Sequence, residues 1–382
     1  MEQRHTLLVT NDLGPHAGGI ESFILGLIGE MDGNQIVIYT STEDGYEEFD
    51  RELNARYGVV VVRDKSKMLL PTPRVNRAVA RIMHTYGSKY IWFGAAAPLG
   101  LMSGLLKKRG AERIVALTHG HEVWWAKVPL FRSALRIMAR YIDVITYLGE
   151  FTKNAMRPAF GKNAKMVRIA PGIDTTHFSP GVRDVSLIKQ YGLEGKKVIV
   201  CVGRLVRRKG QDRLVEAMPD ILTHHEDAHL LIVGRGSYVN HLKKRAVKIG
   251  IADHVTFVGR IKFAELPLYI RLGDVFAMPS RSRYAGLEVE GLGIVYLEAS
   301  SCGIPVVAGA SGGAPDAVLQ GETGVVVNGN DIPEIAREIS ALLTNSSQRE
   351  AMSKRGREWT VAEWSWQLWG KRFSELLYSK TI

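Results

Sequence analysis

Short apolar segments alternate with longer amphipathic segments along almost the whole of this 382-residue chain. The apolar segments are continuous, which is typical of strands buried on both faces of a parallel sheet. The segments between them have helical spacing. This alternation predicts an α/β fold in which helices cover both faces of parallel sheets. The expected strands form two runs: Thr6–Thr10, Gln35–Thr40, Val59–Arg63, Tyr90–Phe93, Arg113–Thr118, Val144–Tyr147 and Lys165–Ile169, then Lys197–Val202, His229–Val233, His254–Val258, Val275–Met278, Pro305–Ala308 and Gly324–Val327.

The two runs of strands indicate two domains. A chain of 382 residues is long for one domain and long enough for two, each with its own hydrophobic core. The segment Pro171–Phe178 is rich in turn-forming residues and separates the two runs, so we interpret it as the interdomain linker. We therefore predict domains at residues 1–172 and 173–364.

Cysteine content and hydropathy favour a cytoplasmic protein that is not integral to a membrane. Cys201 and Cys302 are too few for a disulfide framework, and both are expected to be buried and reduced. The chain runs almost directly into a strand, so we expect no secretory signal. The stretch Tyr90–Leu106 has 17 uncharged residues, but glycines and a proline interrupt it, and a bilayer span needs about 20.

The positive charge is concentrated in one part of the first domain. The net charge of the chain is +11. Residues 63–140 carry 15 Lys or Arg against 3 Asp or Glu, whereas residues 1–62 carry 3 against 11. Such a block implies an anionic partner, which could be a membrane surface, a nucleic acid or an acidic substrate.

Glu290 and Glu298 lie on either side of a glycine-containing entry into a helix, with Glu298 expected about two turns inside it. The free backbone N–H groups of Gly293, Ile294 and Val295 would form an anion site at the helix N-terminus. Because carboxylates repel phosphate, the two glutamates are expected to accept hydrogen bonds from hydroxyls on either side of it. The implied ligand is a sugar, a diphosphate and a ribose in a row. Taken alone, such a glutamate pair is more typical of a solvated helix face.

The loop after the strand Lys197–Val202 supplies cations. Arg204 and Lys209, five residues apart in this loop, would meet the negative charge of a diphosphate. Arg207 and Arg208, between them, are expected to be solvated loop charges.

The glycine-rich loops do not match a dinucleotide-binding fingerprint. Gly18 and Gly19 follow the first strand and would let the backbone approach a ligand closely, since no Cβ intervenes. The Gly-x-Gly-x-x-Gly spacing is absent there. A second candidate starts at Gly234 and Gly236, but Val239 occupies the third glycine position. This argues against a nicotinamide-dependent dehydrogenase.

The sequence favours an anion site without a metal. His119, His121 and Glu122 form a His-x-His-Glu pattern, but a third ligand at zinc spacing is missing. No Asp-x-Asp motif follows a strand in either half. The diphosphate charge would then be met by Arg204, Lys209 and the helix N-terminus.

Together with the glutamate pair, an ordered series of motifs resembles the retaining glycosyltransferases of the GT-B fold: Gly203–Gly210, Leu230–Gly234, Gly259-Arg260, Asp274–Ser280, Gly303–Ala308 and Gly312–Asp316. The resemblance spans nearly the whole chain. It implies two Rossmann-like domains facing across a cleft, the first binding the acceptor and the second the nucleotide sugar, without a metal ion. It also implies that a C-terminal helix, at about 365–382, crosses back to the first domain.

The same resemblance assigns roles to particular residues. Gly19 would contact the donor diphosphate or sugar, and His119 would contact the donor sugar beside the reacting carbon. Arg260 and Ile261 would hold the nucleobase, largely through backbone groups. The implied catalytic residues are His119, Glu290, Arg204 and Lys209, and the implied donor-binding residues are Gly19, Arg204, Lys209, Arg260, Ile261, Gly293, Ile294, Val295 and Glu298.

The acceptor side carries the basic block. Trp124 and Trp125 precede a helix with Arg132, Arg136 and Arg140 at i, i+4 and i+8. Paired tryptophans beside an arginine stripe suit a bilayer interface rich in anionic lipids. An ordinary amphipathic helix packed on the sheet is the alternative. Further basic residues extend the surface: Lys65, Lys67, Arg74, Arg77 and Arg81.

Four segments are similar to the actinobacterial phosphatidylinositol mannosyltransferases: Thr10–Asp12, Trp92–Leu99, Thr118–Val123 and Gly286–Glu298. This similarity implies GDP-mannose as donor and phosphatidylinositol monomannoside as acceptor, with an α-1,6-linked dimannoside as product. It places Asp12 on the acceptor side and the protein on the inner face of the plasma membrane. Alternatives are another nucleotide sugar, another lipid or soluble acceptor, or a basic nucleic-acid-binding protein, although no helix-turn-helix, RNP or zinc-finger pattern is present.

Overall fold

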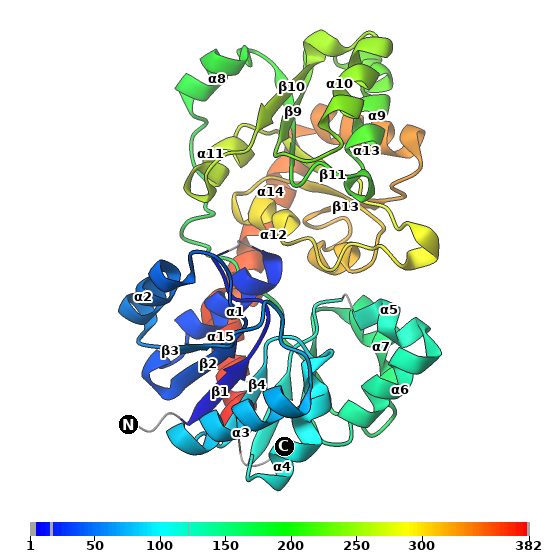
Figure 1. Ribbon diagram of the computed structural model, residues 1–382. Coiled ribbons are helices and arrows are strands. Elements are labelled where there is room, and N and C mark those ends of the chain that lie inside the picture. Colours follow the sequence, from blue (N-terminus) through cyan, green and yellow to red (C-terminus); the bar gives the residue numbers. More distant parts are fainter. Residues whose placement is uncertain (1–4, 16–17, 121, 380–382) are drawn as a thin grey trace. The chain divides into compact units, whose positions relative to one another are not determined.

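The computed structural model describes residues 5–15, 18–120 and 122–379. The chain divides into two compact units. Unit 1 comprises Met1–Gly172 and Trp366–Ile382, and unit 2 comprises Ile173–Ser365. Each unit contains one parallel sheet flanked by helices (Figure 1). All the predicted strands are present, with ends that differ from the predicted ones by no more than two residues.

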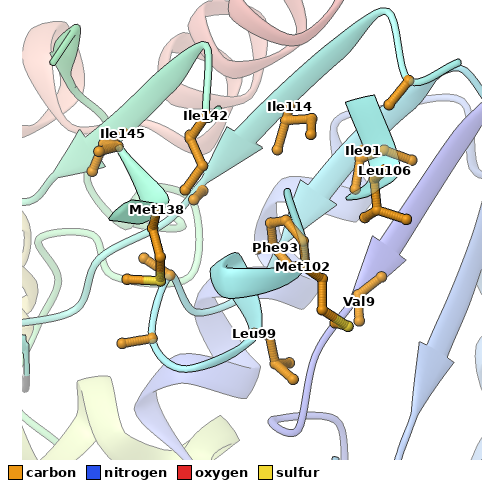
Figure 2. Packing of buried hydrophobic residues seen from close by; sticks show 14 of the residues in the cluster. Val9, Ile91, Phe93, Leu99, Met102, Leu106, Ile114, Met138, Ile142 and Ile145 are labelled. Carbon is orange, nitrogen blue, oxygen red and sulfur yellow. The ribbon is translucent and has the colours of Figure 1, made fainter. Parts of the chain in front are cut away.

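The sheet of unit 1 has seven parallel strands in the order β3-β2-β1-β4-β5-β6-β7. The strands are β1 (Thr6–Val9), β2 (Ile36–Thr40), β3 (Val60–Arg63), β4 (Tyr90–Phe93), β5 (Arg113–Ala116), β6 (Val144–Tyr147) and β7 (Met166–Arg168). The α-helices are α1 (Gly19–Gly29), α2 (Tyr46–Tyr57), α3 (Pro73–Tyr86), α4 (Ser103–Lys108), α5 (Glu122–Lys127), α6 (Pro129–Met138), α7 (Glu150–Phe160) and α15 (Trp366–Tyr378). Side chains from the central strands pack against those of the covering helices (Figure 2).

Helix α15, the last helix of the chain, packs within unit 1. The rings of Trp92 on β4 and Phe373 on α15 lie 4.6 Å apart between centroids. The Arg113 side chain donates a hydrogen bond of 2.7 Å from Nε to the carbonyl oxygen of Leu376. At Gly26 on α1 an added Cβ would lie 2.2 Å from the Trp366 ring, so the glycine allows this close packing. Residues at the end of the sequence thus complete the core of the first unit.

The sheet of unit 2 has six parallel strands in the order β10-β9-β8-β11-β12-β13. The strands are β8 (Lys197–Val202), β9 (Ala228–Val233), β10 (Val255–Gly259), β11 (Val275–Met278), β12 (Val306–Gly309) and β13 (Gly324–Val327). The α-helices are α8 (Val185–Tyr191), α9 (Gln211–His224), α10 (Val239–Lys248), α11 (Leu266–Ile270), α12 (Ile294–Ser301), α13 (Ile332–Thr344) and α14 (Ser346–Glu363).

The strand order reverses once in each sheet. In unit 1, β1 lies between β2 and β4, and in unit 2, β8 lies between β9 and β11. Open parallel sheets bind ligands beyond the carboxyl ends of the strands at such a reversal. The loops that follow β1, β4, β8 and β11 are therefore the expected positions of a ligand-binding site.

Cys201 and Cys302 are both buried and free, as predicted. Among the described residues, no helix is both long enough and apolar enough to cross a bilayer.

Candidate active site

The loop after β8 is held against the loop after β11. It ends in a single 3-10 turn, Arg207–Lys209, followed by Gly210 with φ +78° at the start of α9. A Cβ at Gly210 would lie 1.9 Å from the carbonyl oxygen of Pro279, so only glycine fits. The backbone N–H of Arg281 donates to the carbonyl oxygen of Arg208 over 2.8 Å. These contacts fix the backbone that carries Arg208 and Lys209.

Glu290 forms a buried ion pair with two cations of this loop. Its Oε2 atom lies 2.8 Å from Nζ of Lys209 and 2.6 Å from Nη1 of Arg208. The three side chains are only 9% (Glu290), 12% (Lys209) and 17% (Arg208) exposed. The expectation that Arg208 is a solvated loop charge is therefore wrong, because its side chain turns toward the carboxylate.

The two glutamates of the motif have opposite pKa shifts. Burial alone would raise the pKa of Glu290, but Lys209 and Arg208 outweigh it, so the pKa is lowered and the group is ionised. Burial raises the pKa of Glu298 to about 7, and the charge of Lys209 opposes only part of that rise. The two carboxyls therefore titrate in different pH ranges, and Lys209 acts on both.

Helix α12 begins later than the sequence predicted. Gly293 adopts a left-handed conformation with φ +78° at the helix N-cap, and the helix starts at Ile294. Glu298 is consequently little more than one turn inside the helix, not two. The hydroxyl of Tyr296 donates to the carbonyl oxygen of Met278 over 2.7 Å, which ties α12 to the end of β11. The N–H groups of Gly293, Ile294 and Val295 lie at the start of this helix, where the first backbone donors have no partner within the helix.

A pocket of about 800 Å³ lies at the carboxyl ends of β8, β9 and β10. Its lining includes three residues that the sequence assigned to the donor: Arg204, Arg260 and Ile261. Gly236 in the loop after β9 lies against the loop after β8, where an added Cβ would be 2.1 Å from the carbonyl oxygen of Leu205. The Gly-x-Gly at this position therefore serves loop packing beside the pocket.

In unit 1, His119 follows β5, and its ring is bound to the loop after β4. Its Nε2 donates to the carbonyl oxygen of Gly94 over 2.6 Å, and the Phe23 ring meets the imidazole edge-on at 5.6 Å. The backbone N–H of His119 donates to the carboxylate of the buried Glu122 over 3.0 Å. His121 lies outside the described residues. Among those described, no group of three or more His, Cys, Asp or Glu could hold a metal ion.

The glycine pair after β1 borders open space. Gly18 caps α1, and its N–H donates to the Glu21 carboxylate over 2.9 Å. A Cβ added at Gly18 or Gly19 would meet none of the described residues within 4 Å. Asp12 lies earlier in this loop, where its N–H donates to the Thr10 hydroxyl over 2.9 Å.

Two basic surfaces lie on unit 1. On α6, Arg132 and Arg136 are exposed, as are Leu130 (76%) and Ile137 (49%). Arg140 is also exposed, but the helix ends at Met138, so the third arginine lies in the turn after it and not on the predicted helical stripe. Both Arg132 and Arg136 donate to a single carbonyl on α7, over 3.4 and 3.3 Å. The rings of Trp124 and Trp125 cluster with Phe131 at 5.0 and 4.8 Å.

The second basic surface is concave. A cavity of about 550 Å³ beside β3 and α3 is lined by five cations and one carboxylate: Arg63, Lys65, Arg74, Arg77, Arg81 and Asp64. Asp64 is already engaged, because Arg74 donates to it over 2.7 and 2.8 Å. The cavity lining is therefore strongly positive.

Comparison with known proteins identifies the family. Residues 186–359 match the family described as Glycosyl transferases group 1, and residues 17–177 match Glycosyltransferase Family 4. The GDP-mannose-dependent alpha-(1-6)-phosphatidylinositol monomannoside mannosyltransferase of Mycolicibacterium smegmatis is 44% identical to this chain over 97% of each. The chain belongs to glycosyltransferase family 4. A Corynebacterium glutamicum enzyme, named as acting on the monoacylated monomannoside, is 41% identical to this glycosyltransferase over 99% of this chain and 98% of its own.

Solved structures support the GT-B fold. Anabaena HepE in complex with UDP aligns with a TM-score of 0.81 at 19% identity, covering 99% of this chain and all of its own. Sucrose-phosphate synthase from Thermosynechococcus elongatus aligns with a TM-score of 0.76 at 21% identity, covering 98% of each chain. The two parallel-sheet units of this glycosyltransferase thus have the GT-B fold.

Sequence reasoning missed a second buried ion pair beside the site of this glycosyltransferase. Arg281 donates from both terminal nitrogens to the Asp212 carboxylate, over 2.9 and 2.7 Å, and both side chains are less than 10% exposed. The pair links the loop after β11 to α9. The two residues are 69 positions apart in the chain, and no local pattern connects them.

Proposed function

We propose that this glycosyltransferase moves mannose from GDP-mannose to phosphatidylinositol monomannoside, with retention and without a metal ion, to give the α-1,6-linked dimannoside. The observation that carries the proposal is the 44% identity, over 97% of both chains, to the mycolicibacterial enzyme named for that donor and acceptor. The buried cluster of Lys209, Arg208 and Glu290 supports it, because it offers both a cation for a diphosphate and a carboxylate for sugar hydroxyls.

In the proposed reaction the bond between the anomeric carbon and the diphosphate oxygen breaks as the acceptor hydroxyl attacks from the same face. The hydroxyl proton passes to the departing diphosphate. Lys209, Arg204 and the N-terminus of α12 stabilise the negative charge that develops there. The Glu290 carboxylate accepts hydrogen bonds from hydroxyls of the mannose, and the Glu298 carboxylate accepts them from hydroxyls of the ribose.

The remaining assigned residues are proposed to contact the donor. Arg260 and Ile261 line the pocket of unit 2 and are proposed to hold the guanine. Gly19 is proposed to contact the donor through its backbone N–H, since an added Cβ there would meet none of the described residues within 4 Å. His119 is proposed to contact the mannose. Since two cations and a helix N-terminus meet the diphosphate charge, the proposed site has no need of a divalent ion.

The first test is the mass of the product. Purified protein, GDP-mannose and extracted membrane lipids should give a lipid one hexose heavier than phosphatidylinositol monomannoside, and the yield should be the same in EDTA. Transfer from another nucleotide sugar in preference to GDP-mannose would contradict the donor assignment. Loss of activity in EDTA with rescue by magnesium or manganese would contradict metal independence.

We further propose that the enzyme binds the inner face of the plasma membrane through the basic surfaces of unit 1. The exposed arginines on α6 and in the turn after it lie beside exposed apolar side chains, and the cavity beside α3 is lined by cations. Each basic residue near an anionic bilayer contributes roughly 1 kcal/mol to the free energy of membrane binding. At physiological salt this attraction is screened beyond about 8 Å.

Replacing Arg132, Arg136 and Arg140 by serine should weaken binding to anionic vesicles severalfold, as measured by co-sedimentation. Activity on acceptor embedded in a membrane should fall with it. Hydrolysis of the donor should hardly change, because Glu290 and Lys209 are in unit 2.

The matched control removes three cations from an exposed helix face of unit 2, at Lys243, Lys244 and Lys248. It should bind vesicles like the parent. If the arginine variant also bound like the parent, α6 would be an ordinary solvated helix face. If that variant lost donor hydrolysis, the arginines would instead serve the fold, as their hydrogen bonds to α7 allow.

A further inference from the structure

One oxygen atom of Glu290 has two cationic partners. Its Oε2 lies 2.6 Å from Nη1 of Arg208 and 2.8 Å from Nζ of Lys209. Arg208 also approaches a second carboxylate, with its Nε 3.8 Å from Oε1 of Glu288. A buried carboxylate needs at least one counter-ion, since removing its partner leaves an uncompensated charge. Two counter-ions on one oxygen exceed that need.

The proposed function requires Lys209 to serve a second anion. When the donor binds, the Lys209 ammonium must turn toward the diphosphate, and its compensation of Glu290 weakens. A lysine is suited to such sharing because its charge is compact and its stem flexible. Arg208 has a planar group with fixed donors, and its backbone is held separately through the Arg281 N–H.

We infer that Arg208 is a positioning residue, which holds the Glu290 carboxylate toward the sugar while Lys209 engages the donor diphosphate. The inference rests on the proposed function for the identity of that donor. The role is specific to Arg208: the side chain of its neighbour Arg207 is exposed, whereas that of Arg208 is only 17% exposed.

Other groups also face Glu290. Tyr296 of α12 interacts with Glu290 electrostatically, and the backbone N–H of Glu290 donates to the Ser311 hydroxyl over 3.3 Å. Glu298 lies across Lys209, whose charge acts on both carboxyls. Among these groups the cations are Lys209 and Arg208, and both lower the pKa of Glu290. Removing Arg208 should therefore raise that pKa.

The test is the pH profile of kcat/KM with GDP-mannose for Arg208→Gln, with Glu298→Gln as the parent in every comparison. Glu298, whose pKa is about 7, would otherwise set the acidic limb and hide the titration of Glu290. Because Glu290 would then ionise only at higher pH, the acidic limb should move to higher pH and kcat should fall about tenfold. In Arg208→Lys the acidic limb should lie close to its position in the parent, because the positive charge is kept. In Arg207→Gln the limb and kcat should be those of the parent. An active parent with an unshifted limb in Arg208→Gln overturns the inference. If the unsubstituted protein transfers from no nucleotide sugar, the proposed function is overturned instead.

A double-mutant cycle separates positioning from direct donor contact. If Arg208 acts through Glu290, Arg208→Gln should weaken GDP-mannose binding when Glu290 is present. The same substitution should change the affinity little in a protein that already carries Glu290→Gln, as measured by calorimetry. Additive losses would show that Arg208 contacts the donor itself and would overturn the inference.

A second variant keeps Arg208 in place in case Arg208→Gln fails to fold. Glu288→Gln removes the competing carboxylate, so Arg208 should bind Glu290 alone and the acidic limb should move to lower pH. An unmoved limb in this variant would also overturn the inference.

Discussion

Replacing Lys209 by alanine should lower kcat by at least about 10²-fold, as does the loss of a group that stabilises charge in a transition state. The substitution removes the cation proposed to meet the leaving diphosphate. Lys209 is only 12% exposed, so its charge acts in a medium that screens less than water. Arg204→Ala should also lower kcat by about 10²-fold, and by less than Lys209→Ala, because Arg204 is exposed.

Steady-state kinetics with GDP-mannose and the lipid acceptor would check this prediction. Arg207→Ala is the matched control: it lies in the same loop, is exposed, and has no part in the proposed site. Near-normal turnover in both the Lys209 and the Arg204 variants would contradict their assignment to the diphosphate.

The strands could be predicted because their signal is local. A strand buried on both faces is apolar at every position, so the pattern ends where the strand ends. β4, β6, β8, β11 and β13 have the predicted bounds. The carboxyl ends of β8 and β11 then indicated where the loops with Lys209 and Glu290 would lie, since parallel strands end at the same edge of a sheet.

The details of the site depend on contacts that sequence does not display. Arg207 and Arg208 are chemically identical neighbours, and the 3-10 turn together with the Arg281 N–H decides which one faces Glu290. The position of Glu298 depends on Gly293, whose left-handed backbone delays the start of α12. His119 is fixed by a carbonyl 25 residues earlier in the chain. For Arg208 and His119 a tertiary contact decides among options that the local sequence leaves equal, and for Glu298 the backbone conformation of one glycine does.

Replacing Glu298 by glutamine should make the free protein more stable at pH 8 while weakening its binding of the donor. Burial raises the pKa of Glu298 from 4.5 to about 7. The folded state therefore holds this proton more tightly than the unfolded state does. The stability due to the group is fully present below pH 4.5 and is lost as the pH rises through about 7. A glutamine has no charge to bury, so at pH 8 the variant should gain about 2–3 kcal/mol.

Urea unfolding of parent and variant at pH 5 and pH 8 would measure this effect: the two should differ little at pH 5 and clearly at pH 8. Equal stability at pH 8 would contradict the raised pKa. Glu290→Gln is the matched control and should change stability with the opposite sign. The pKa of Glu290 is lowered by its cations, so its ionised form stabilises the fold, and the glutamine would leave Arg208 and Lys209 buried without that charge. If Glu298→Gln also binds GDP-mannose less tightly, then the carboxylate that costs the free protein stability is the one proposed to hold the donor ribose.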